Sequence, residues 1–71
     1  MAQAKWEDVS KYIQAVFEMN GRVDRRTAYD MALNDGADDD VTDAIDAIGS
    51  RIINTPDEVK AFLISEGWVV E

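Results

Sequence analysis

Hydrophobic residues recur at helical spacing in four stretches of this chain, and a glycine follows each stretch. Residues three, four and seven positions apart lie on one face of an α-helix, which turns once every ~3.6 residues. Glycine readily adopts the left-handed conformation in which helices commonly end. The four glycines are Gly21, Gly36, Gly49 and Gly67. The pattern predicts four helices with short connections, without a linker, a low-complexity segment or an internal repeat.

The first predicted helix covers residues 6–19 and the second covers residues 25–34. An extended link, residues 22–24, separates the two helices, and Asp24 is the expected N-cap of the second. The residues expected to face inward from these helices are Trp6, Val9, Ile13, Val16, Phe17, Ala28, Met31 and Ala32, with Tyr12 at the edge of the first apolar stripe.

The third predicted helix begins near Asp38, ends before Gly49 and has two faces of opposite character. Its apolar face comprises Val41, Ala44, Ile45 and Ile48. A second face carries Asp39, Asp43 and Asp46, with Asp40 nearby. Asp38 or its neighbour is the expected N-cap, where a carboxylate opposes the positive end of the helix dipole. Asp43 and Asp46 lie past the first turn, so capping does not explain them, and we expect them to repel one another.

The fourth predicted helix has the clearest start in the sequence. Thr55 is its expected N-cap, Pro56 takes the first helical position, and Glu58 completes a capping box. The helix is expected to continue to about residue 66. The residues that it should bury are Val59, Phe62 and Leu63.

Short strands are expected on either side of the fourth helix, at residues 51–54 and 68–70. The two strands can pair in parallel with each other, because a helix connects them. An antiparallel pairing with residues 22–24 is the alternative. The fold class that results is mainly α. Residues 1–71 form one compact four-helix domain with the order α-α-α-β-α-β and one minimal two-stranded sheet.

This element order resembles a winged helix-turn-helix, with small, turn-forming and apolar residues at Ala32, Gly36 and Ile45. In that family the helix after the turn enters the major groove of DNA. The corresponding helix here carries Asp39, Asp40, Asp43 and Asp46. Carboxylates repel the phosphates that a DNA-binding helix must approach. We therefore expect winged-helix-like architecture without the DNA-reading role.

A second resemblance covers Gly36 to Leu63 and depends on the acidic helix, a short strand segment and the start of the last helix. The matching residues are Ala37, Asp38, Asp39, Asp40, Val41, Ala44, Ile45, Ile48, Arg51, Thr55, Pro56, Asp57, Glu58, Val59 and Leu63. They look like a small acidic prokaryotic family known only as a domain of unknown function. The resemblance implies a fold and no activity.

Composition limits the chemistry available to this chain, which contains no cysteine and no histidine. Disulfides, thiolate metal sites and imidazole catalysis are therefore excluded. A calcium loop needs a different spacing, because Gly36 comes too early and no glutamate follows at the far end. We predict a protein that is not an enzyme and has no cofactor and no metal site. No apolar run approaches the roughly 20 residues of a membrane span, and a disulfide-free domain of this size suits the cytoplasm.

The charge is strongly uneven along the chain, whose formal net charge is −8. Between Thr27 and Ser50 there are seven aspartates and no lysine or arginine. Such a field attracts basic partners and opposes phosphates, although a charged face also serves solubility alone. The candidate partner-binding residues are Asp38, Asp39, Asp40, Asp43 and Asp46. The leading hypothesis is an acidic protein-interaction module that presents this helix to a basic protein, in its sharper form as a DNA mimic or inhibitor.

The alternative hypothesis is nucleic-acid binding through a small basic cluster, Arg22, Arg25 and Arg26. The net charge disfavours this hypothesis, because nucleic-acid-binding domains usually carry a basic surface. A local ion pair with Asp30, or a contact with the Tyr29 ring, also accounts for these arginines. The domain is expected to be a monomer, or a homodimer formed through exposed apolar residues such as Ile64, Trp68 and Val70.

Overall fold

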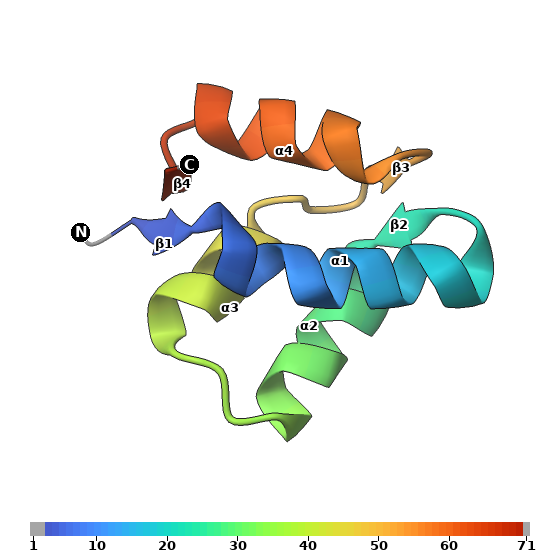
Figure 1. Cartoon of the computed structure of the whole chain (residues 1–71), viewed down its shortest axis with the longest axis horizontal. Helices are drawn as coiled ribbons and strands as arrows, with labels where there is room; N and C mark the ends of the chain where they lie inside the picture. The colour runs from blue at the N-terminus through green and yellow to red at the C-terminus, as the bar shows by residue number, and fades with distance from the viewer. Residues whose placement is uncertain (1–2, 71) are drawn as a thin grey trace.

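The computed structural model describes residues 3–70, and its helices are arranged around α1, Trp6–Asn20 (Figure 1). Helix α4, Pro56–Ser65, lies along one side of α1, and α2, Arg25–Asn34, and α3, Asp39–Asp46, lie on the other side. Helices α2 and α3 also pack against each other. The predicted mainly α, four-helix class is confirmed, and the element order agrees approximately with the winged-helix-like order.

Four two-residue strands form two separate pairs where the sequence predicted a single minimal sheet. Strand β1, Ala4–Lys5, pairs in parallel with β4, Val69–Val70, so the two ends of the described chain meet. Strand β2, Val23–Asp24, pairs antiparallel with β3, Ile52–Ile53. The antiparallel alternative for the strand before α4 is therefore correct.

Parallel pairing between the strand before α4 and the strand after it is wrong, and the length of α4 explains why. Strands β3 and β4 lie at opposite ends of this ten-residue helix (Figure 1). At ~1.5 Å per residue, the helix separates its two ends by about 15 Å. The chain does not turn back over α4 to bring the strands together. Strand β1 had no sequence signal, because it consists of alanine and lysine, which have low strand propensity.

The helix ends follow the local signals in the sequence. Thr55 accepts a hydrogen bond from the backbone N–H of Glu58 at 3.3 Å, and Asp24 accepts one from the N–H of Thr27 at 2.9 Å. Gly21 ends α1 with a φ of 73°, and its N–H donates to the Phe17 carbonyl oxygen. Asp38 does occupy the N-cap position of α3, as predicted, but its side chain makes no capping hydrogen bond.

One continuous hydrophobic core joins the four helices and the strands. The residues that the solvent does not reach include Val9, Ile13, Val16, Ala28, Ala32, Ala44, Ile45, Ile48, Val59 and Leu63. The larger side chains predicted to face inward, Trp6, Phe17, Met31 and Phe62, pack against this core but remain half-buried. No helix in the described part of the chain is both long and apolar enough to cross a bilayer.

Candidate functional site

Helix α3 separates the core from a row of carboxylates. Ala44 and Ile45 are fully buried on its inner face, whereas Asp39 and Asp43 are exposed on its outer face. Asp38 is also exposed and Asp40 is half-buried. Within residues 3–70, the side chains of Asp38, Asp39, Asp40 and Asp43 form no ion pair and no hydrogen bond. We call these four aspartates the α3 acidic face. Their charge is not neutralised by any group that the structure describes.

Asp46, the fifth predicted partner-binding residue, is in a different situation from the other four. Arg25 at the start of α2 donates a hydrogen bond from Nη1 to Asp46 Oδ1 at 3.1 Å. The two side chains are 39% and 62% exposed, so solvent screens the pair. Arg25 thus pairs with Asp46 rather than with Asp30 or the Tyr29 ring. This ion pair marks the end of the α3 acidic face.

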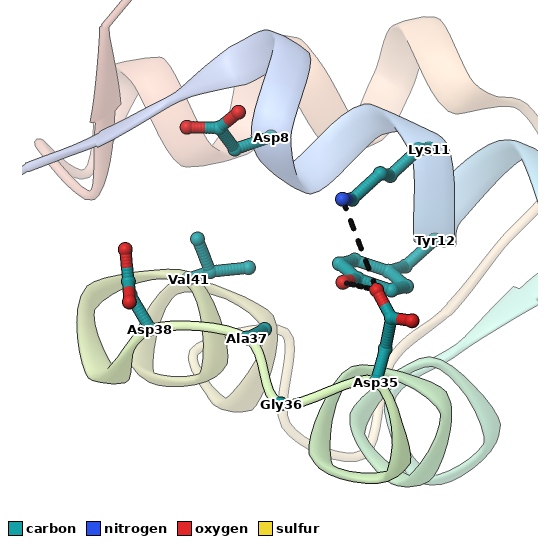
Figure 2. Close-up of a pocket in the computed structure, with 8 residues that line it drawn as sticks. All are labelled: Asp8, Lys11, Tyr12, Asp35, Gly36, Ala37, Asp38 and Val41. Atoms are coloured by element: carbon teal, nitrogen blue, oxygen red, sulfur yellow. Dashed lines mark hydrogen bonds and ion pairs between the residues drawn. The ribbon is translucent and has the colours of Figure 1, made fainter.

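A hollow of about 220 Å³ lies beside the α3 acidic face, between α1 and the turn that joins α2 to α3 (Figure 2). Its lining residues are Asp8, Lys11, Tyr12, Asp35, Gly36, Ala37, Asp38 and Val41. Asp8 comes from α1, Asp35 from the end of α2 and Asp38 from the start of α3. Three carboxylates from three segments therefore line one concavity, together with the single ammonium group of Lys11.

Tyr12 holds the inner end of this hollow, and its residue is only 6% exposed. Its hydroxyl donates a hydrogen bond to Asp35 Oδ2 at 2.6 Å. Lys11 Nζ lies 3.9 Å from the same oxygen and 5.0 Å from the centroid of the Tyr12 ring. The hydrogen bond to Asp35 and then burial raise the pKa of Tyr12 above 10.0, against the smaller opposing effect of the Lys11 ammonium.

The hollow contains residues that sequence reasoning did not assign to the site: Asp8, Lys11, Tyr12 and Asp35. A signal for three of them was present, because Asp8, Lys11 and Tyr12 are spaced to share one side of α1. The sequence contained no signal that this side of α1 faces Asp35. That contact joins residues 23 positions apart and depends on how α1 and α2 pack.

The basic cluster predicted at the start of α2 is partly occupied. Arg22 and Arg26 are exposed, but the guanidinium group of Arg25 is bound to Asp46. A second hollow of about 410 Å³ lies at the start of α1, lined by Lys5, Trp6, Glu7 and Lys60. Its lysines are separate from the arginine cluster in the sequence and in the fold.

The chemistry available to the site is electrostatic. Among the described residues, no group of three or more acidic side chains is placed to hold a metal ion. Asp8, Asp35 and Asp38 line an open concavity, and Asp39 and Asp43 are exposed on the neighbouring helix face. No protein-family model, curated protein or solved structure matches this chain.

Proposed function

We propose that this protein is a non-catalytic, cytoplasmic interaction module that presents an acidic helix to a basic protein partner. The observation that carries the proposal is the α3 acidic face, whose four carboxylates lie on α3 and its N-cap residue and have no partner within residues 3–70. Opposite charges across an interface steer association and select the correct partner. A lysine- or arginine-rich segment has the complementary charge.

The repulsion within this face supports a role beyond folding. Asp39 and Asp43 are four residues apart, a spacing at which like charges destabilise a helix by about 0.2–0.5 kcal/mol. Packing of the inner face places no requirement for charge on these outer positions. A basic partner would offset this repulsion, because its cations would attract both carboxylates.

The hollow provides an anchor point at one end of the α3 acidic face. Its volume of about 220 Å³ accommodates the end of a lysine or arginine side chain. The carboxylates of Asp8 and Asp38 face the space from α1 and α3 (Figure 2). We propose that one cationic side chain of the partner enters here while neighbouring cations contact Asp39 and Asp43.

The narrower form of the proposal is that the chain acts as a DNA mimic or inhibitor, with its carboxylates in the places of phosphates. This form predicts competition, because the partner's basic surface would accept either the α3 acidic face or duplex DNA. The alternative function, nucleic-acid binding by Arg22, Arg25 and Arg26, has weaker support because Arg25 is paired with Asp46.

Titration of a labelled peptide of alternating arginine and glycine tests the proposal at ionic strengths of about 0.03 and 0.3 M, where screening differs strongly. We expect binding that weakens steeply with salt. The site variant combines Asp38→Asn, Asp39→Asn and Asp43→Asn, and asparagine is also a favoured residue at the N-cap position 38. The matched control removes three negative charges elsewhere, with Glu18→Gln, Asp30→Asn and Glu66→Gln at exposed positions.

We expect the site variant to lose most of the affinity and the control variant to retain most of it. Equal losses in the two variants would mean that only net charge matters, and the proposed site would be rejected. Displacement of the peptide from duplex DNA by the wild-type chain would support the mimic form. Binding of labelled DNA to the chain itself, abolished by Arg22→Gln and Arg26→Gln, would favour the alternative function.

A further inference from the structure

We infer that Lys11 is a built-in competitor at the hollow, where its ammonium group occupies the position that a partner's cation would take. This inference rests on the proposed function, because it concerns regulation of the same site. Lys11 Nζ lies over the Tyr12 ring, 5.0 Å from the centroid, and 3.9 Å from Asp35 Oδ2 (Figure 2). An aromatic face beside a carboxylate is a favourable environment for an ammonium or guanidinium group.

The two partners of Lys11 are held in place independently of Lys11. Tyr12 is buried against the core, and its hydroxyl donates to Asp35 at 2.6 Å. Asp35 follows the last residue of α2, and its N–H donates to the Met31 carbonyl oxygen. Tyr12 and Asp35, which would contact the partner's cation, are therefore already in position before a partner binds.

Lys11 itself is held only weakly in its position. Its side chain is 61% exposed, and that of Asp35 is 62% exposed. Exposed ion pairs and exposed cation–π contacts are both weak and are screened by salt. The flexible lysine stem can turn the ammonium group into solvent without disturbing the core. A partner's cation can therefore replace Lys11 without any rearrangement of the helices.

Replacement of Lys11 makes the site selective for extended basic segments. When a ligand with one ammonium group replaces the Lys11 ammonium over Tyr12, the net gain in binding free energy is small. A segment with several cations also reaches the carboxylates of Asp39 and Asp43, which have no partner in the described chain. The gain from these additional contacts exceeds the loss of the Lys11 contacts. Lys11 thus lowers affinity for small amines without preventing binding of a polybasic partner.

The test compares two variants that each remove one positive charge. Lys11→Met keeps an unbranched stem in the hollow but removes the competing ammonium group. Lys5→Met is the matched control, because Lys5 is exposed and lines the other hollow. Affinity for the labelled arginine–glycine peptide is measured at about 0.1 M ionic strength, where the Debye length is about 10 Å.

We expect Lys11→Met to bind the peptide about fivefold more tightly than wild type, in line with the weak contacts it removes. Lys5→Met should change the affinity by less than about twofold, because Lys5 lines the other hollow and contacts neither Asp35 nor the Tyr12 ring. Equal effects of both variants would overturn the inference and leave the proposed function standing. Absence of peptide binding by wild type and by both variants would overturn the proposed function, and the inference with it.

Nuclear magnetic resonance of wild type gives a second readout that does not depend on a variant. The ring current of Tyr12 shields protons above its face, so the Lys11 side-chain resonances report whether Lys11 occupies the hollow. We expect these resonances to move towards free-lysine positions as the peptide saturates the protein. Unchanged Lys11 resonances at saturation would show that Lys11 and the peptide do not compete, which would overturn the inference.

Discussion

The inner and outer faces of α3 differ in burial and in charge, although they belong to the same eight residues. Ala44 and Ile45 on the inner face are fully buried, and the packing of α3 against α1, α2 and β1 constrains their size and polarity. Asp39 and Asp43 on the outer face are exposed and contact no charged group within residues 3–70. The inner face explains why the helix is where it is. On the outer face, the helix dipole favours Asp39 in the first turn, but neither the dipole nor any contact within residues 3–70 accounts for the charge of Asp43.

The same distinction divides the aspartates themselves. Asp46 and Asp35 join helices to each other, through Arg25 and through Tyr12. Asp38, Asp39 and Asp43 join nothing in the described chain. Carboxylates of the first kind contribute to the tertiary structure, whereas those of the second kind supply charge at a surface. Four experiments test this division, from the largest expected effect to the smallest.

The largest effect is expected on the inner face. Ile45→Ala leaves a cavity in a fully buried position and should lower the free energy of unfolding by about 2–5 kcal/mol. Chemical denaturation measures this loss. Asp43→Ala on the outer face of the same helix serves as the control and should change stability by less than about 0.5 kcal/mol. Similar losses at the two positions would contradict the division of the helix into two faces.

The next effect concerns the hydrogen bond between Tyr12 and Asp35. Tyr12→Phe removes the 2.6 Å hydrogen bond and should lower the free energy of unfolding by about 1 kcal/mol at neutral pH. Because the pKa of folded Tyr12 is raised above 10.0, its contribution is complete below pH 10.0 and is lost as pH rises through the folded pKa. Denaturation at pH 9 and 11 should show that wild type loses this contribution to the free energy of unfolding and that Tyr12→Phe does not. Tyr29→Phe, which keeps Tyr12, should behave like wild type.

A smaller effect is expected for the ion pair between Arg25 and Asp46. A double-mutant cycle with Arg25→Gln and Asp46→Asn should give a coupling energy of about 0.2–1 kcal/mol, because both side chains are substantially exposed. The coupling should decrease at high salt. A coupling of zero at low salt would place Asp46 with the aspartates that have no structural role.

The smallest effect, and the one with the opposite sign, is expected for Asp43. Asp43→Asn relieves repulsion with Asp39 and Asp46 and should raise the free energy of unfolding by about 0.2–0.5 kcal/mol at low salt. High salt should abolish the gain. Asp39→Asn is the comparison: it also relieves repulsion but loses a favourable charge in the first turn of α3, so its net effect should be near zero. A loss of stability in Asp43→Asn would reveal a structural role for this carboxylate.

Much of the fold was predictable because its signals are local. The spacing of Val41, Ala44, Ile45 and Ile48 identified the buried face of α3, and all four are buried. Asp24 and Thr55 were identified as N-caps from their residue type and their position before a helix, and both accept the expected hydrogen bonds. Strand pairing was less predictable, because β1–β4 and β2–β3 each join residues far apart in the chain.

The candidate site was predictable only in part. The sequence placed Asp39, Asp40 and Asp43 together on α3, since neighbours on a helix remain neighbours in any fold. It did not indicate that Asp8 and Tyr12 of α1 face the turn after α2 and form a hollow there. It also did not distinguish Asp46 from the other aspartates, because its partner Arg25 is 21 positions away.

The sequence by itself determined the helices, most of their ends, their buried faces and the acidic character of α3, although α3 ends at Asp46, earlier than the expected end before Gly49. Each of these depends on residues within a few positions of one another, where backbone geometry sets the distances. Only the tertiary structure decided which carboxylates are paired, where the hollow lies and that Lys11 lines it. These properties depend on how α1 packs against α2 and α3. Helical periodicity specifies which face of a helix is buried, but it does not specify which other element packs against that face.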